Sequence, residues 1–247
     1  MSRKLILALL LVSTNSFAFW SDVEKSWEAA HVYYPGSAEQ RTTKDLSTLT
    51  KTYPVVIYMH GCAGIWSAHD DRWAQALAYR GYVVILPDSL AREGRVSNCS
   101  AASKKPTGAF KNWAYYREQE IDHALEQVQK STWGNAQQVY LIGHSEGAIA
   151  TALYSSKGFK AHVIMGWTCT SREYPRYDGL HSPKAVPVMV INRATDPWFA
   201  GTPFDGSCMD KANGRSVTPL MLPGNGHLLF GRDQVEEVDK FLKGSTQ

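Results

Sequence analysis

The sequence predicts one α/β domain built around a mainly parallel β-sheet. Short β-branched, apolar runs alternate with longer stretches of helical periodicity over most of the 247 residues, which is the pattern of strands joined by crossover helices. Several of the runs are apolar throughout, as expected for strands that are buried on both faces. No internal repeat, low-complexity tract or linker interrupts this alternation, so we expect a single domain.

Six runs are predicted as strands, and an earlier segment is predicted as an antiparallel edge strand. The six are residues 55–59, 82–86, 138–142, 161–165, 186–191 and 216–221, and the edge strand covers 31–34. Helices are expected over 70–79, 111–130, 145–154 and 233–242. In the second helix Ile121, Leu125 and Val128 recur at spacings of four and three, which places one apolar stripe against the sheet.

The first 18 residues predict a secretory signal peptide. Arg3 and Lys4 precede an apolar run at residues 5–12, and a small-residue segment ends at Ala18, as in a cleaved leader. We expect cleavage after Ala18, an α/β domain over residues 19–247, and a secreted or periplasmic product. The alternative is a buried N-terminal helix. The apolar run is well short of the roughly 20 residues that a membrane-crossing helix needs.

Charge and cysteine content narrow the class of protein further. Lysine and arginine number 26 against 23 acidic residues, without a basic block, so no nucleic-acid partner is expected. In an oxidising compartment the four cysteines can form two disulfides, in three alternative pairings. No Cys-x-x-Cys spacing occurs, which argues against a structural zinc site.

Three long connections follow predicted strands, at residues 87–110, 166–185 and 192–215. Loops of this length in a compact domain are usually functional. Because each follows a strand of a parallel sheet, we expect them to gather at the carboxyl ends of the strands, where such sheets bind ligands.

The sequence Gly143-His144-Ser145-Glu146-Gly147 lies between a predicted strand and a predicted helix. This is the pattern of a nucleophile elbow, in which glycines permit a tight turn that presents the serine to substrate. A serine hydroxyl needs a general base and a third group that orients the base. Asp196 and His227 each follow a later strand, and the order Ser145, Asp196, His227 is that of α/β-hydrolases. We therefore expect these three residues to form a catalytic triad.

An oxyanion hole is expected from backbone N–H groups of Cys62 and Glu146. Cys62 lies in the loop that directly follows the strand at residues 55–59, and Glu146 follows the nucleophile, the two positions that supply these donors in this fold. His60, at the start of that loop, is expected to be a buried hydrogen-bonding residue and not a catalyst.

Taken together, these residues resemble the dienelactone hydrolase-like branch of the α/β-hydrolases, in a secreted form. The resemblance covers about residues 53–241 and rests on the elbow, the His60–Gly64 loop, Asp196 and His227, and on further matching residues: Trp73, Gly81, Tyr82, Asp88, Ser89, Leu90, Arg92 and Cys99. Dienelactone hydrolases themselves use a cysteine nucleophile, whereas this elbow holds serine. The resemblance therefore implies ester hydrolysis more firmly than a dienelactone substrate.

The resemblance also implies a Cys62–Cys99 disulfide, with Cys169 and Cys208 left as the second pair. The long loops are rich in aromatic and basic residues, and a substrate cleft is expected to be lined by Trp66, Arg92, Trp167, Trp198 and Phe199. An aryl or carboxylate-bearing ester would suit such a cleft. The alternative is that the aromatic residues pack the loops down and that the arginines are solvated or paired with acidic residues.

The sequence thus predicts an exported serine hydrolase that cleaves a small or medium carboxylic ester through an acyl-enzyme, with no cofactor and no metal. Three alternatives stay open: a serine peptidase or amidase with the same triad, a metal-dependent hydrolase using His60, His69, Asp70 and Asp71, and a non-catalytic binding protein of the same fold. A small-molecule ester is the expected partner, and no oligomeric state is predicted.

Overall fold

The computed structural model describes residues 15–100, 105–171, 175–199 and 206–245. Its centre is a seven-stranded sheet in the order β1-β3-β2-β6-β7-β8-β9, in which β1 alone runs antiparallel to its neighbour. The strands are β1 His31–Tyr33, β2 Tyr53–Met59, β3 Val83–Leu86, β6 Gly134–His144, β7 Ala161–Met165, β8 Val188–Arg193 and β9 Val217–Leu222. A separate two-stranded hairpin pairs β4 Cys99–Ser100 with β5 Lys105–Pro106.

The predicted α/β class and the mainly parallel sheet are confirmed, and every predicted strand is present, with the edge strand antiparallel as expected. The largest difference is β6, which extends to residues 134–144 where 138–142 was predicted. Its first half carries Gly134, Asn135 and Gln137, which are not apolar and so do not predict a strand. Tyr53 of β2 pairs with Gly134, and this pairing extends the strand to that residue.

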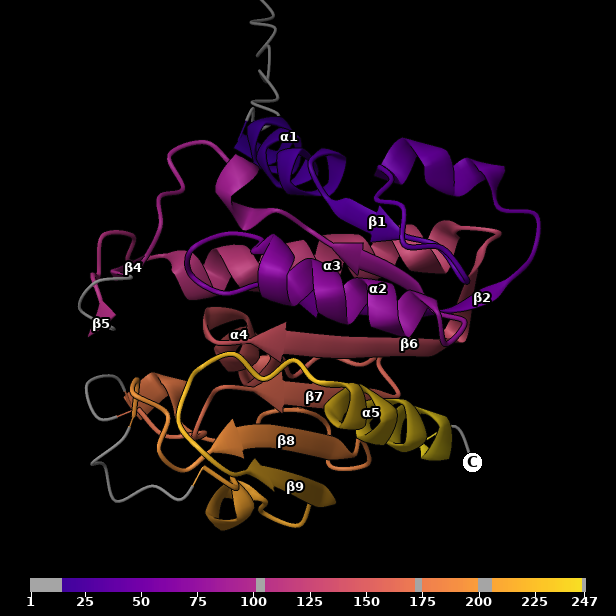
Figure 1. Ribbon diagram of the computed structural model, residues 1–247. Helices are drawn as coiled ribbons and strands as arrows, with labels where there is room; N and C mark the ends of the chain where they lie inside the picture. The colour runs from indigo at the N-terminus through magenta and orange to yellow at the C-terminus, as the bar shows by residue number, and fades with distance from the viewer. Residues whose placement is uncertain (1–14, 101–104, 172–174, 200–205, 246–247) are drawn as a thin grey trace, which may run out of the picture.

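Five α-helices accompany the sheet in the described part of the chain: α1 Asn15–Glu28, α2 Arg72–Ala78, α3 Trp113–Lys130, α4 Glu146–Leu153 and α5 Arg232–Gly244. Helices α2 and α5 pack on one face of the sheet, and α1, α3 and α4 on the other (Figure 1). Strand β2 shows how alternation divides the core, because Val56 and Tyr58 face the first group while Val55 and Ile57 face the second. Successive side chains of a strand point to opposite faces, so both faces are buried and the sheet is the middle of three layers.

Helix α1 is not among the predicted elements. Val23 and Trp27 are buried four residues apart, a helical spacing that the sequence does contain. The helix crosses the predicted cleavage position, and cleavage after Ala18 would leave residues 19–28 to pack on α3. The apolar run at 5–12 lies outside the described residues, so the signal peptide stays a prediction.

A π-helical turn over Ser67–Asp71 precedes α2, where an α-helix from residue 70 was predicted. Asp70 explains the difference, because its buried carboxylate accepts hydrogen bonds from the hydroxyl of Tyr58 (3.0 Å) and the N–H of Trp66 (2.8 Å). These inward bonds fix the turn before the regular helix begins at Arg72.

The loops that follow β2, β3, β6, β7 and β8 lie at the carboxyl ends of the parallel strands, on the left of Figure 1. The β4–β5 hairpin belongs to the connection after β3. The sheet therefore brings together residues from distant parts of the sequence at this one edge.

Candidate active site

Ser145 occupies the turn between β6 and α4 in a conformation that residues other than glycine rarely adopt. Its φ is 56° and its ψ is −117°, a combination that the surrounding structure must enforce. The Ser145 N–H donates to the carbonyl of Met165 at the end of β7 (2.8 Å), and the Ser145 carbonyl accepts from the N–H of Ile149 (3.1 Å). Both ends of the residue are thus held, and its side chain lies at the N-terminus of a helix, where the helix dipole is positive.

The two glycines of the elbow are required by close backbone contacts. A Cβ atom on Gly143 would lie 2.2 Å from the carbonyl oxygen of Gly147, and one on Gly147 would lie 2.0 Å from the carbonyl oxygen of Met59. Real Cβ atoms do not approach this closely, and in both cases the obstacle is main chain that cannot swing away. The turn is therefore open to glycine alone at both positions.

Asp196 and His227 form a hydrogen-bonded pair. The Nδ1 atom of His227 lies 2.6 Å from Oδ2 of Asp196, whose side chain is fully buried. The other carboxylate oxygen accepts the N–H of Trp198 (2.9 Å). Because both oxygens have partners, the carboxylate has one orientation, and its acceptor oxygen requires the proton of the imidazole to sit on Nδ1.

Ser145 and His227 both lie at the end of β7. Ser145 is bonded to Met165, and the next residue, Gly166, has the His227 ring beside its Cα, since a Cβ there would lie 3.0 Å from Cε1 of the ring. The Nε2 atom of His227 is buried and has no hydrogen-bond partner among the described residues. The structure thus brings the three predicted triad residues to one edge, with an unpaired imidazole nitrogen.

Two further histidines hold the loop that carries His227. His144 donates from Nε2 to the carbonyl of His227 (2.9 Å), and the N–H of Leu229 donates to Nε2 of His69 (3.2 Å). His69 in turn donates from Nδ1 to Asp70 (2.9 Å). Burial holds the pKa of His144 well below its usual range, and the neighbouring His69 and His227 lower it further. These contacts were not predicted. The sequence feature that points to them is the position of His144 inside the elbow.

The loop after β2 passes directly beside Ser145. A Cβ on Gly61 would lie 3.4 Å from the Cβ of Ser145. In the described part of the chain, no hydrogen bond engages the N–H of Cys62 or of Glu146. His60 is buried, donates from Nδ1 to the Gly61 carbonyl (2.7 Å) and accepts the N–H of Ser89 at Nε2 (3.0 Å). The expectation that His60 is a structural residue therefore agrees with its contacts.

The Glu146 side chain lies in a buried cluster of charges. Its Oε1 accepts hydrogen bonds from Arg95 and from Arg117 (3.1 Å), and its Oε2 accepts one from Asn98 (3.2 Å). Burial raises the pKa of the nearby Glu120, and the charge of Arg117 opposes the shift. The sequence predicted a role for the Glu146 N–H but not for Arg117, Asn98 or Glu120, because the partners of these side chains come from segments far apart in the chain.

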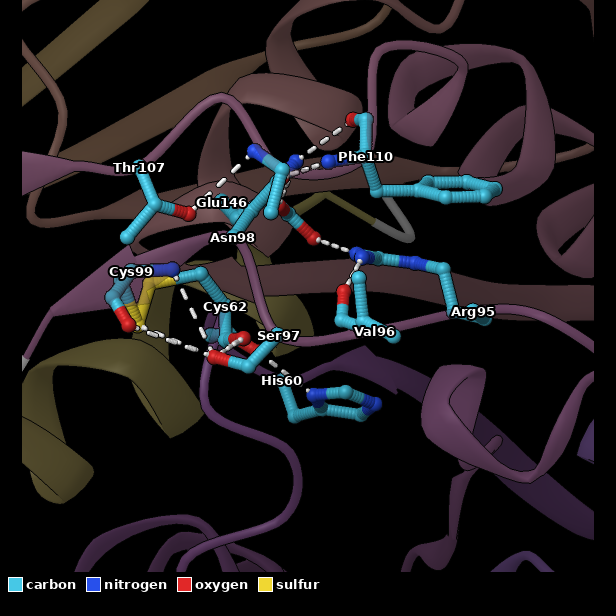
Figure 2. Close-up of a disulfide and its surroundings, with 12 residues drawn as sticks. His60, Cys62, Arg95, Val96, Ser97, Asn98, Cys99, Thr107, Phe110 and Glu146 are labelled. Atoms are coloured by element: carbon cyan, nitrogen blue, oxygen red, sulfur yellow. Dashed lines mark hydrogen bonds and ion pairs between the residues drawn. A yellow bond between two sulfur atoms is a disulfide. The ribbon is translucent and has the colours of Figure 1, made fainter.

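Disulfides join Cys62 to Cys99 and Cys169 to Cys208, each with a Cα–Cα distance of 5.5 Å. The first ties the loop beside Ser145 to the segment after β3, and Figure 2 shows how its surroundings reinforce it. The Cys62 carbonyl accepts from the hydroxyl of Ser97 (2.9 Å) and the N–H of Asn98 (3.3 Å). The second disulfide is buried and joins the connections after β7 and β8.

The expected cleft residues have different surroundings. The Trp198 ring lies 5.2 Å from that of His227, Trp66 is 51% exposed, and Trp167 is half-buried next to Gly166. Phe199 is buried, with its N–H donating to the Asp196 carbonyl (3.1 Å). Trp198 is therefore the aromatic residue that the structure places beside the candidate base.

The cleft prediction is wrong for Arg92, which is 3% exposed. Its guanidinium donates to Asp22 (2.9 Å), to the Tyr116 carbonyl (3.0 Å) and to Gln119 (2.8 Å). An arginine whose donors are satisfied inside the protein has none left for a substrate, so Arg92 fastens α1 to α3.

A profile of the dienelactone hydrolase family matches residues 43–173, more than half of the chain. The chain belongs to the dienelactone hydrolase family. The matched region includes the elbow and the loop after β2, whereas Asp196 and His227 lie beyond it. A search of curated proteins found no match.

Solved structures with the same fold include hydrolases of several kinds. One from Klebsiella pneumoniae, assigned as a dienelactone hydrolase, is 17% identical, with coverage of 88% of this chain and 98% of that one and a TM-score of 0.61. Est1E from Butyrivibrio proteoclasticus is 13% identical, with coverages of 87% and 93% and a TM-score of 0.58. Dipeptidyl peptidase 4 from Porphyromonas gingivalis is 16% identical with a TM-score of 0.55, and the match covers 87% of this chain but 33% of that one. At these identities the likeness establishes the fold.

The four residues of the metal-dependent alternative do not form one cluster in this dienelactone hydrolase family member. Among the described residues the group with ligand atoms within 4.8 Å of one another is His69, Asp70 and His144, while Asp71 pairs with His31 (2.8 Å). Burial favours a raised pKa for Asp70, but the hydrogen bond from His69, the charge of His144 and further bonds outweigh it and hold the pKa at about 2. The carboxylate is thus satisfied by the protein itself. No described helix is long and apolar enough to cross a membrane.

Acidification is expected to destabilise this family member through its buried histidines. Burial lowers the pKa values of His60 and His144 well below the usual range and that of His162 to about 4. The unfolded chain takes up these protons near pH 6.5 and the folded protein does not, so their contribution is complete above pH 6.5 and is lost as the pH falls toward 4. Each histidine adds up to about 1.4 kcal/mol per pH unit. Urea unfolding from pH 7.5 to 4.5 measures this slope.

The contribution of His162 to this pH dependence can be tested by itself. His162→Gln keeps a donor for the Thr151 carbonyl, which His162 Nδ1 contacts at 3.0 Å, and should flatten the slope below pH 6.5. His181→Gln, at an exposed position, is the matched control and should leave the slope unchanged. Equal slopes in all three proteins would contradict the assignment.

Removal of the disulfide beside Ser145 is expected to cost stability. Cys62 and Cys99 are separated by 37 residues, and closure of a loop of that length in the unfolded chain is worth about 3–4 kcal/mol. The double substitution Cys62→Ala and Cys99→Ala should lower the free energy of unfolding by that amount in denaturant titrations. A loss below about 1 kcal/mol would show that the cross-link does not constrain the unfolded chain.

Proposed function

We propose that the protein is a serine hydrolase that cleaves a small or medium carboxylic ester, with Ser145 as nucleophile, His227 as general base and Asp196 as the group that orients it. The observation that carries this proposal is the 2.6 Å contact between His227 and Asp196, at the same edge of the sheet as a serine held at positive φ. A proton on Nδ1 leaves Nε2 as the basic nitrogen. Membership of the dienelactone hydrolase family supports hydrolase chemistry.

In this proposal, Ser145 Oγ attacks the ester carbonyl while Nε2 of His227 accepts its proton. The negative charge on the carbonyl oxygen is stabilised by the N–H groups of Cys62 and Glu146. The tetrahedral intermediate collapses, the proton passes from His227 to the leaving alcohol, and an acyl-serine remains. Water then repeats the two steps with His227 as base, which releases the acid and restores the serine.

The choice of ester over amide is tested with a matched pair of substrates, 4-nitrophenyl butyrate and butyryl 4-nitroanilide. We expect kcat/KM for the ester to exceed that for the anilide by at least about 100-fold, and both activities to disappear in Ser145→Ala. Comparable values would favour a peptidase or amidase, a class with which the chain shares its fold. Turnover of neither substrate by folded protein would favour a binding protein.

We also propose that the protein is exported, because both disulfides require an oxidising compartment and the first 18 residues have the pattern of a leader. Expression of the full sequence in a bacterium, followed by fractionation and N-terminal sequencing, tests this. The expected product starts at Phe19 and lies outside the cytoplasm. An uncleaved chain in the cytoplasm, with reduced cysteines, would contradict it.

A further inference from the structure

One buried guanidinium holds both parts of the proposed oxyanion hole. Arg117 of α3 is 0% exposed. It donates to the carbonyl of His60 (2.9 Å) and to that of Gly61 (3.2 Å), in the loop after β2. It also donates to Oε1 of Glu146 from two of its nitrogens (3.1 and 3.2 Å), at the start of α4.

The bond to Gly61 determines the direction of the Cys62 N–H. The Gly61 carbonyl and the Cys62 amide belong to one planar trans peptide, so the C=O and N–H bonds point in opposite directions. The carbonyl oxygen is held on one side by Arg117 and by Nδ1 of His60 (2.7 Å). The N–H must therefore point the other way, and the same stretch of loop lies against Ser145.

The second donor is fixed through its own side chain. Glu146 begins α4 with its N–H unpaired among the described residues, while its carboxylate is bound by Arg117, Arg95 and Asn98. Asn98 connects this carboxylate to the disulfide loop, because its own N–H donates to the Cys62 carbonyl (3.3 Å) (Figure 2). The positions of both N–H groups, of Cys62 and of Glu146, are thus set by one rigid, planar group, the guanidinium of Arg117.

We propose that Arg117 is a positioning residue that sets the spacing and direction of the Cys62 and Glu146 N–H groups. This inference rests on the proposed function, since it assigns a role in stabilising the oxyanion. A guanidinium is suited to the task because its donors have a fixed geometry, which an ammonium group lacks. Arg117 does not touch the reacting atoms and acts through the peptide and the carboxylate that it holds.

Arg95 provides a matched control within the same cluster. It is also a buried arginine and also binds Oε1 of Glu146. Its other bonds go to the Val96 carbonyl and to the hydroxyl of Ser89 (3.3 Å), and among the described residues no hydrogen bond joins it to the loop after β2. A role confined to charge pairing with Glu146 would make the two arginines equivalent, whereas a positioning role distinguishes them.

The test compares Arg117→Lys and Arg95→Lys with wild type, using 4-nitrophenyl butyrate as substrate and a boronic acid, whose serine adduct is tetrahedral, as inhibitor. Loss of a whole oxyanion donor costs about 100- to 1,000-fold in kcat, so misplacement of both should cost Arg117→Lys about 10- to 100-fold. The KM should stay within about threefold, because the oxyanion forms after binding. The Ki of the boronic acid should rise in parallel with the loss of kcat. Arg95→Lys disturbs the Glu146 link alone and leaves the Gly61 link intact, so its loss of kcat should be at least about threefold smaller than that of Arg117→Lys.

Equal losses in the two folded variants, or a raised KM at unchanged kcat, would overturn the positioning role while leaving the esterase proposal intact. A wild type without ester turnover would overturn both. Should Arg117→Lys fail to fold, Glu146→Gln tests the same link, because it keeps the backbone N–H but weakens the bond to Arg117. It should lower kcat at least about fivefold at unchanged KM, and an unchanged kcat would contradict the proposal.

Discussion

Asp196→Asn is expected to lower kcat for ester hydrolysis by about 10,000-fold while the protein stays folded. The Trp198 N–H, 2.9 Å from Oδ1, requires an acceptor, so the amide oxygen of asparagine should take that place. The NH₂ group then faces Nδ1 of His227, which can only accept. The imidazole proton moves to Nε2, and this nitrogen can no longer act as the general base.

The measurement is kcat on 4-nitrophenyl butyrate, together with the thermal unfolding midpoint of each protein. Asp210→Asn is the matched control, since Asp210 lies in the same connection after β8 with its side chain 63% exposed. The control should keep full activity. A loss below about tenfold in Asp196→Asn would remove Asp196 from the mechanism.

Gly147→Ala is expected to lower the free energy of unfolding by at least about 4 kcal/mol, or to prevent folding. The new Cβ would lie 2.0 Å from the Met59 carbonyl oxygen and 2.7 Å from that of His60. Relief would require α4 to move away from β2, which would also displace the loop beside Ser145. Activity should therefore fall together with stability.

Gly244→Ala is the control for helix propensity in this experiment. Gly244 is also helical, and a Cβ there meets nothing within 4 Å, so alanine should be neutral or slightly stabilising. Urea unfolding of both variants gives the comparison. A loss below about 1 kcal/mol in Gly147→Ala would show that the close approach of α4 and β2 is not required.

Most of the sheet was predictable because strands β2, β3, β7 and β8 are largely buried on both faces and therefore read as continuous apolar runs. Residues 161–165 match β7 at both ends. The start of β6 was missed because Gly134 and its polar neighbours form a strand through pairing with β2, which is a tertiary effect. Helix α1 was missed because its apolar spacing at Val23 and Trp27 follows directly on a segment with the composition of a leader.

The residues of the candidate site differ in the same way: the place of some follows from the local sequence, and the place of others depends on tertiary contacts. The gathering of Ser145, Asp196 and His227 at one edge of the sheet was predictable because each has a fixed place relative to a strand in this fold. Arg117 was not, since nothing local in α3 distinguishes it from a solvated arginine until the sheet brings the loop after β2 against it. Arg92 was assigned to the cleft because the local sequence does not show that it is buried. Its partner Asp22 is 70 residues away in the sequence.

The central claim is that Ser145 is an activated nucleophile, and the intact mass of the oxidised protein after exposure to a fluorophosphonate tests it most directly. The account predicts one adduct per chain on wild type and none on Ser145→Ala. The absence of an adduct on folded wild type, or an adduct that persists in Ser145→Ala, would contradict it.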